Sequence, residues 1–248
     1  MVTRLLSKLS PFDLKRQKFH RRLKNFYSTT IEKGDLCIDV GANVGDFTRA
    51  LSSCGAHVVA VEPQRDCLKK LRTKYQNYPG VTIVGSALGA APGGGKIYLV
   101  ESHTVASMSR EWITSVKRCG RFQDQGWQVT QDVEIITLDS LIVNYGLPNY
   151  VKIDVEGYEL QVLKGLSVSV PLLSFEFTPE SPSDALNCID HLSRLGTIHI
   201  NHTVDRYRAM AFSNWMDTRE ASTYFSAWSA RGVMRIADIF VRTDACQD

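Results

Sequence analysis

The chain has 248 residues, of which 44% are hydrophobic and 22% charged, and its formal net charge at pH 7 is +3. This size and composition fit one large α/β domain with additions, and they exclude a disordered chain. No apolar run reaches the ~18–20 residues that span a membrane, and no secretory signal is visible, so we expect a cytoplasmic protein. The six cysteines form no Cys-x-x-Cys pair, which predicts reduced thiols rather than disulfides or a zinc site.

The first 33 residues form a basic segment with nine basic and two acidic side chains, so they carry about +7 and the remainder about −4. We expect helices here, with a break at Ser10-Pro11. The segment could contact an anionic substrate, a membrane surface or nucleic acid. It could equally be a solvated helix face that packs through its leucines and phenylalanines. We therefore predict two parts, a helical N-terminal extension over 1–33 and a domain over 34–248.

Strands and helices alternate from residue 34 onward, which predicts a mostly parallel sheet with right-handed crossovers. In chain order we expect strand 36–40, helix 45–53, strand 57–61, helix 65–76, strands 81–84, 96–100 and 132–137, helix 141–145, strand 150–155, helix 159–166, strand 172–177, helix 183–195, and strands 197–201 and 236–241.

The regions between these elements are less regular. Residues 90–95 are predicted as a glycine-rich turn and 101–131 as less regular. Asp139 is placed to cap the helix at 141–145. The segment 202–235 is rich in aromatic side chains, which could cover an acceptor molecule or pack the late helix onto the sheet.

The most informative segment is Cys37-Ile-Asp-Val-Gly-Ala-Asn-Val-Gly-Asp46. It predicts a buried strand that enters a glycine turn and then a helix, which is the geometry of a nucleotide-binding corner. Gly41 and Gly45 allow the backbone to turn tightly and to approach a ligand. A third glycine in register, as in the dinucleotide fingerprint G-x-G-x-x-G, is missing.

An acidic residue, Glu62, follows Gly41 by 21 positions at the end of the next apolar run. A carboxylate at this place can accept both hydroxyls of a ribose. Asp39, before the turn, could meet the α-amino group of an amino-acid tail. Extra acids would repel a pyrophosphate but would suit a sulfonium and an ammonium group. The pattern therefore favours S-adenosylmethionine (SAM) over NAD as the cofactor.

A second motif, Val151-Lys-Ile-Asp-Val-Glu-Gly-Tyr-Glu159, brings three acids to the end of a predicted strand. Ligands bind at that edge of open α/β sheets. If Asp154, Glu156 and Glu159 share a site, at least one pKa should rise and favour base catalysis. Glu159 could instead stabilise the start of a helix.

The chain resembles the FkbM-type methyltransferases, which are SAM-dependent O-methyltransferases. The motifs that carry this resemblance span roughly residues 34–180 and are Ile38-Asp-Val-Gly-Ala-Asn-Val-Gly, Val61-Glu-Pro63, Ser86-Ala-Leu-Gly89, Thr137-Leu-Asp-Ser140, Lys152-Ile-Asp-Val-Glu-Gly-Tyr-Glu159 and Phe175-Glu-Phe177. The resemblance implies a class I SAM-methyltransferase fold, Rossmann-like, with a seven-stranded, mostly parallel sheet whose last strand is antiparallel.

The resemblance also implies the residues of the site. Those expected at the cofactor are Asp39, Gly41, Ala42, Asn43, Gly45, Glu62, Pro63, Ser86 and Ala87. Asp154 and Glu156 are expected near the transferring methyl group, and either could be the catalytic base or position it. His103 in a loop is a competing base, and Glu176 is a further candidate. Asp154, Glu156 and Glu176 together could hold Mg²⁺, but nothing in their spacing demands it, so we predict no metal.

The predicted function is transfer of a methyl group from SAM to a hydroxyl of a small molecule or glycan, such as a sugar or a polyketide-like compound. Two alternatives remain, an NAD-dependent oxidoreductase and a non-catalytic SAM-binding protein. The oxidoreductase is disfavoured by the missing glycine and by the absence of a Tyr-x-x-x-Lys pair. We expect no nucleic-acid substrate, because the chain lacks the Asn/Asp-Pro-Pro-aromatic element typical of base methylation. Contact with a membrane surface through the basic N-terminus stays open.

Overall fold

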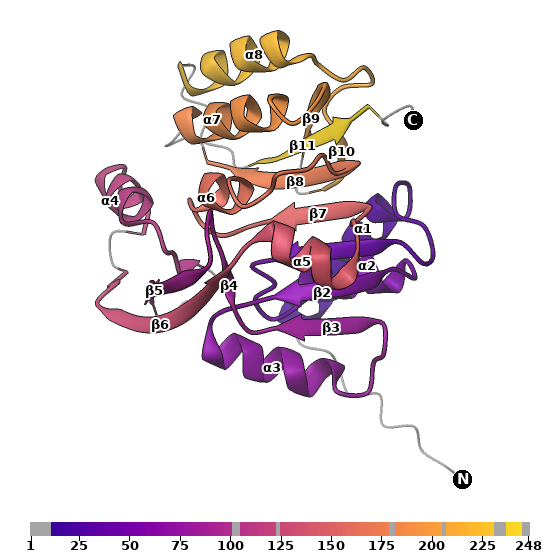
Figure 1. Ribbon diagram of the computed structural model, residues 1–248, viewed down its shortest axis with the longest axis vertical. Helices are drawn as coiled ribbons and strands as arrows, with labels where there is room; N and C mark the ends of the chain where they lie inside the picture. Colours follow the sequence, from indigo (N-terminus) through magenta and orange to yellow (C-terminus); the bar gives the residue numbers. More distant parts are fainter. Residues whose placement is uncertain are drawn as a thin grey trace.

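The computed structural model describes residues 11–100, 105–122, 125–178, 182–204, 207–230 and 237–244 (Figure 1). In chain order the elements are α1 (Pro11–Tyr27), β1 (Leu36–Val40), α2 (Asp46–Ser53), β2 (His57–Val61), α3 (Arg65–Tyr75), β3 (Val81–Val84), β4 (Ala87–Leu88), β5 (Gly93–Leu99), α4 (Arg110–Arg118), β6 (Val129–Ile136), α5 (Leu138–Tyr145), β7 (Tyr150–Ile153), α6 (Glu159–Leu163), β8 (Leu172–Phe177), α7 (Pro182–Ser193), β9 (Ile198–Val204), β10 (Ala209–Met210), α8 (Thr218–Ala230) and β11 (Ala237–Thr243).

The main sheet has the order β10-β9-β11-β8-β7-β1-β2-β3. Strands β3, β2, β1, β7 and β8 are parallel, whereas β11 runs antiparallel to both of its neighbours, β8 and β9. The predicted mostly parallel sheet with an antiparallel last strand is confirmed, and the short strand β10 adds an eighth. The chain continues from β1 to β2 on one side and from β7 to β8 on the other, so the strand order reverses between β1 and β7. Because ligands bind at the carboxyl edge beside such a switch point, the site is expected there.

Helices cover both faces of this sheet, and the sequence explains the layers. The inner strands are buried on both sides, which is why they are near-continuous apolar runs such as Val58–Val61. One core cluster packs α5 to α8 against the sheet, and two others pack α1, α2 and α3 against the opposite face. Figure 1 shows α7 and α8 at the top of the view, α3 at the bottom and the smaller sheet at the left.

Helix α1 is built into the core of the domain. Leu23 and Tyr27 are buried in the cluster that it shares with α2 and the sheet. The Tyr27 hydroxyl lies 3.1 Å from that of Tyr150 in β7, which lies 2.6 Å from the Ser174 hydroxyl in β8. The helix predicted in this segment is therefore present from Pro11 onward. The expected break at Ser10 lies outside the described residues.

The second sheet, β4-β6-β5, corrects the prediction for the glycine-rich segment. The glycine-rich segment 90–95 is not all turn, because β5 already begins at Gly93 and pairs with β6. Pairing supplies the backbone hydrogen bonds, so the turn preference of glycine is overridden. The segment 101–131, expected to be less regular, contains a helix that was not predicted, α4. The side chain of Ser109 caps that helix by accepting from the backbone N–H of Trp112.

The cap of α5 was also predicted wrongly. The helix begins at Leu138, and Thr137 is its N-cap in a capping box with Ser140. Asp139 cannot cap a helix that it lies within. Its Oδ1 accepts instead from the backbone N–H of Ser167, at 2.9 Å.

The aromatic segment after β9 contains β10 and α8, neither of which was predicted. In α8, the rings of Phe225 and Trp228 pack on Phe177 of β8, with centroids 5.3 and 5.4 Å away. These rings fix the late helix on the sheet. Phe212, Trp215 and Tyr224 instead line the cavity described below. The packing role expected for this segment is confirmed, and Trp228 also lines the cavity, whereas a role in covering an acceptor stays a prediction.

Over the described ranges, no helix is long and apolar enough to cross a membrane. The five cysteines in these ranges are free. Cys246 lies outside them.

Candidate active site

A cavity of about 2540 Å³ opens at the carboxyl edge of the main sheet. Single small-molecule sites typically measure ~300–1,000 Å³, so this cavity has room for two reactants. Its walls come from the turns after β1 and β2, the segment after β7, the end of β8, helix α1 and helix α8. The switch point between β1 and β7 is therefore where the cavity lies.

The turn after β1 is shaped by close backbone packing. Gly41 has φ +77°, and a Cβ at this position would lie 1.9 Å from the carbonyl oxygen of Asp154. Only glycine fits this approach. The N–H groups of Gly41 and Ala42 both donate to the Val61 carbonyl at 3.0 Å. The turn is thus fixed against the ends of β7 and β2 at once.

Glu62 joins this turn to the end of β2. Its Oε2 accepts from the Asn43 N–H at 2.7 Å and its Oε1 from the Gln64 N–H at 2.8 Å. Burial raises the pKa of Glu62 to about 7, although these two hydrogen bonds oppose the rise. Each oxygen can accept a second hydrogen bond. Glu62 can therefore shape the corner and still receive ribose hydroxyls.

Most predicted cofactor residues line the cavity, namely Gly41, Ala42, Asn43, Glu62, Pro63, Ser86 and Ala87. Asp39 and Gly45 lie behind this wall. Asp39 is fully buried and accepts a 2.6 Å hydrogen bond from the Thr48 hydroxyl, and burial raises its pKa. A Cβ on Gly45 would lie 2.8 Å from Leu71 of α3, so this glycine allows close helix packing. Both residues therefore lie next to the corner but do not line the cavity.

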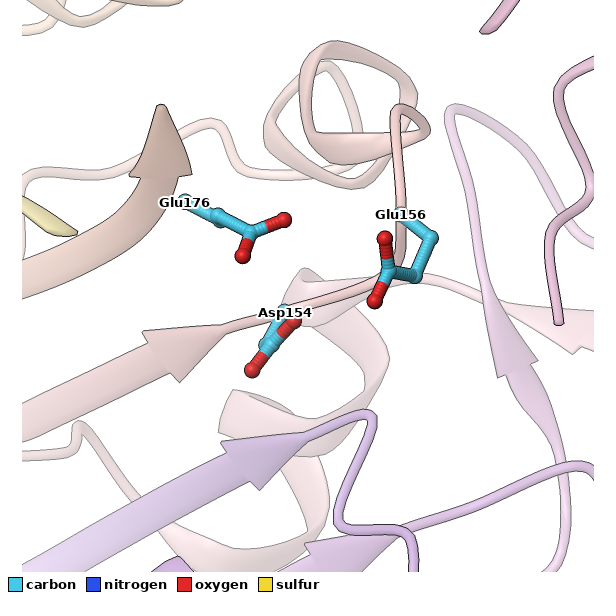
Figure 2. Close-up of side chains that lie close together, drawn as sticks. All are labelled: Asp154, Glu156 and Glu176. Carbon is cyan, nitrogen blue, oxygen red and sulfur yellow. The ribbon is translucent and has the colours of Figure 1, made fainter. Parts of the chain in front are cut away.

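Three carboxylates converge next to the corner. Figure 2 shows Glu176 at the end of β8 and Asp154 and Glu156 in the segment after β7, with their carboxyl groups close together. One oxygen from each lies within 4.8 Å of the others. Burial, followed by repulsion from neighbouring carboxylates, raises the pKa of Glu156 and of Glu176 well above the ordinary value. These groups therefore hold a proton more strongly than exposed glutamates.

The three acids also bear on cation binding. Glu176 Oε2 is buried and has no hydrogen-bond partner among the described residues. Carboxylate oxygens are ligands for Mg²⁺ or Ca²⁺, so the trio could hold a divalent cation. They equally suit the positive charges of a sulfonium and an ammonium group, so the donor set fits SAM. The absence of a metal stays a prediction.

A buried lysine, Lys152, lies beneath the acids and was not singled out from the sequence. Its Nζ lies 2.7 Å from Asp154 Oδ2 and 3.9 Å from the centroid of the Phe47 ring. Burial alone would lower the pKa of Lys152, but Asp154, Asp238 and Asp39 together outweigh it and raise the pKa. Lys152 thus stays charged and orients Asp154. The available signal was a lysine inside the otherwise apolar strand β7.

Glu159 does not line the cavity. Its Oε1 accepts from the N–H groups of Val155 and Gly157 at 3.1 and 3.2 Å. Burial raises the pKa of Glu159 to about 7. Glu159 therefore stabilises the start of α6, which is the structural one of the two roles expected for it.

On the far side of the cavity, His202 and Tyr224 form a pair that sequence reasoning also missed. His202 Nδ1 lies 2.9 Å from the Thr203 carbonyl, which can only accept, so Nδ1 carries the proton. Nε2, 3.0 Å away, then accepts from the Tyr224 hydroxyl. Burial lowers the pKa of His202 and favours this neutral form. The predicted alternative base, His103, lies outside the described residues.

Comparison with known proteins agrees with this geometry. A family model described as the FkbM methyltransferase domain matches residues 39–196, from within β1 to just after α7. The sheet order, the corner and this match define the class of the chain as a SAM-dependent methyltransferase. The chain belongs to the FkbM methyltransferase family.

One curated relative is the hexuronic acid methyltransferase AglP of Haloferax volcanii, 29% identical over 146 residues. The alignment covers 58% of this chain and 55% of AglP, so the chain spans about half the length of that relative.

Two solved structures resemble the chain at low identity. An rRNA methylase from Streptococcus thermophilus is 8% identical with a TM-score of 0.46, over 96% of this chain and 99% of that one. SMU.1697c, a methyltransferase homologue from Streptococcus mutans in complex with SAH, is 12% identical with a TM-score of 0.42, over 98% and 99%. These scores carry no inference about the acceptor.

Proposed function

We propose that this chain transfers a methyl group from SAM to a hydroxyl oxygen of a sugar. The observation that carries the proposal is the convergence of Asp154, Glu156 and Glu176 beside the cofactor corner, in a cavity with room for a second reactant. The name of the relative AglP, a hexuronic acid methyltransferase, supports a sugar acceptor. We retain from the sequence the division into an extension over 1–33 and a domain over 34–248, and the cytoplasmic location, as parts of this proposal.

The corner and the acids have separate tasks in this reaction. When bound, SAM supplies a methyl group on a positively charged sulfur that departs as a neutral thioether. Glu62 would hold the ribose hydroxyls of SAM, and the acid cluster would face its positive charge. Alignment of the acceptor oxygen with the methyl carbon and sulfur supplies a large share of the rate.

A sugar hydroxyl needs a base, since it is a poor nucleophile while protonated. We assign Glu156 to this task, because its pKa is raised and Asp154 is engaged by Lys152. As the acceptor oxygen bonds to the methyl carbon, its proton passes to the Glu156 carboxylate. Asp154, held at 2.7 Å by Lys152, orients the reactants. His103 remains the competing base.

The test is release of S-adenosylhomocysteine on incubation with SAM and a panel of neutral and uronic sugars. We expect Glu156→Gln to lower kcat by ~10²–10⁴-fold while SAM affinity stays within about threefold. Glu32→Gln, an exposed acid away from the cavity, is the matched control.

Asp154→Asn with retained SAM affinity and unchanged turnover would remove Asp154 from the mechanism. Binding of NAD but not of SAM would favour the oxidoreductase alternative. SAM binding without turnover of any sugar or polyketide-like alcohol would favour a non-catalytic SAM-binding protein.

A further inference from the structure

Helix α1 presents a basic stripe to the cavity. Lys15, Lys18 and Arg22 all line it, and their spacing of three and four residues places them on one face of the helix. The adjoining face carries Leu23 and Tyr27, which are buried in the core. Because core packing fixes the rotation of α1, the stripe is held toward the cavity.

The charges of the two lysines in this stripe are not consumed by nearby acids. The neighbouring Arg16 pairs with Asp46 at 2.7 Å. Within the described part of the chain, no carboxylate forms an ion pair with Lys15 or Lys18. Two lysine charges in the cavity wall are therefore available to a bound anion.

The segment after β9 and the start of α8 form another wall. Phe212, Trp215 and Tyr224 line the cavity with aromatic surface, and Arg219 lines it from the first turn of α8. Aromatic side chains with a few charged groups are typical of walls that orient a small ligand. This wall suits the apolar face of a sugar ring.

The cavity is thus divided by charge. Its floor holds Glu62, Asp154, Glu156 and Glu176. The wall from α1 carries the basic stripe, and α8 contributes Arg219 together with an acid, Glu220. The acidic floor suits the positively charged cofactor, which gives no reason for a basic wall. A cationic wall is explained by a second ligand with negative charge.

We infer that the acceptor carries an anionic group, a carboxylate or a phosphate, joined to its sugar ring. Lys15 and Lys18 bind the anion, the ring lies against the aromatic wall, and the reacting hydroxyl faces the acid cluster. This inference rests on the proposed function for the hydroxyl, whereas binding of the anion can be measured by itself.

Calorimetric titration in the presence of S-adenosylhomocysteine tests it with four probes: UDP-glucuronic acid, UDP-glucose, glucuronic acid and glucose. The second probe contains only phosphate as its anion and the third only carboxylate, so they identify the source of the charge. We expect at least one anionic probe to bind about tenfold or more tightly than glucose.

The decisive variant is Lys15→Glu with Lys18→Glu. Its matched control is Arg21→Glu with Lys24→Glu, an equal charge change on exposed residues of α1 that do not line the cavity. The first pair should weaken binding of the anionic probe ~10–100-fold, because hydrogen bonds to charged groups are lost, and the control by less than about threefold. Binding of S-adenosylhomocysteine should change in neither. Lys15→Gln with Lys18→Gln, which introduces no repulsion, should show a smaller loss in the same direction.

The inference is overturned if no anionic probe binds more tightly than glucose, or if the control weakens binding as much as the stripe variant. Methylation of a neutral sugar with a KM unaffected by the stripe variant would leave the proposed function standing and overturn the inference. Stripe-dependent binding of an anionic sugar without methylation of any sugar would support the inference and count against the proposed function.

Discussion

The two halves of the cavity are built in different ways. The half that we assign to the cofactor, called the cofactor half, consists of the turn after β1 and the end of β2. Its backbone groups are fixed by hydrogen bonds such as those that Glu62 accepts from Asn43 and Gln64. The half that we propose for the acceptor, called the acceptor half, consists of side chains from α1 and from the segment around α8, which lie about 200 positions apart in the chain. In this assignment, a cofactor that many enzymes share is bound by a backbone turn of fixed conformation. The acceptor is bound by side chains, which can differ from one enzyme to another.

The substitution that should most strongly break the cofactor half is Gly41→Ala. The added Cβ would lie 1.9 Å from the Asp154 carbonyl oxygen, at a positive φ. Backbone strain and overpacking together should lower the free energy of unfolding by about 2–5 kcal/mol. Gly93→Ala, with nothing within 4 Å of its Cβ, should stay within about 0.5 kcal/mol of the wild type. Equal stability of both variants in urea unfolding would show that the turn is not fixed by this contact.

Loss of the carboxylate in Glu62→Ala should come next. The N–H groups of Asn43 and Gln64 lose their acceptor, and the ribose loses its partner. We expect SAM affinity to fall ~10–100-fold in calorimetry, the equivalent of one or more charged hydrogen bonds. Asp66→Ala, an exposed acid four positions on, should leave it within about twofold. Retained affinity in Glu62→Ala would move ribose recognition elsewhere.

A pH series can separate the structural acid Glu159 from the acids of the cavity. Burial raises its pKa from an ordinary 4.5 to about 7, so the native state binds the proton more strongly than the unfolded state. The free energy of unfolding should therefore fall as pH rises between these values, by about 1–3 kcal/mol from this group. In Glu159→Gln that contribution disappears. A difference between wild type and variant that does not change with pH would contradict the buried environment.

The smallest effect is expected in the acceptor half, from Tyr224→Phe. The variant removes the hydroxyl that donates to His202 Nε2. The free energy of unfolding should fall by about 1 kcal/mol. The acceptor KM should rise while SAM affinity stays unchanged, and Tyr145→Phe, on the exposed surface of α5, should alter neither. A loss of SAM affinity in Tyr224→Phe would mean that the two halves are not independent.

The same contrast explains what the sequence could predict. The bounds of β1, β2, β3 and β8 were predicted correctly, because buried parallel strands are short apolar runs between turn residues. The turn with Gly41 was found because glycine at a tight corner leaves a local signal. The placement of Asp154 and Glu156 near Glu176 also follows, since they end neighbouring parallel strands or lie just beyond them.

The missed features depend on contacts between distant segments. Lys152 left only a weak signal, a lysine in an apolar strand, because two of the three acids that keep it charged, Asp39 and Asp238, come from other strands. His202 and Tyr224 are 22 positions apart and meet only after α8 folds back on β9. Pairing with β6 decided the structure at Gly93 against its local preference.

The anchoring of α1 has a practical consequence for enzyme engineering. The hydroxyl chain from Tyr27 through Tyr150 to Ser174 joins the helix to the two strands that carry or lead to the acids. Positions 15, 18 and 22 lie on a different face of that helix. We therefore expect that exchanging these three positions between homologous enzymes changes the binding of an anionic acceptor and leaves the contacts of Tyr27 with the sheet unchanged.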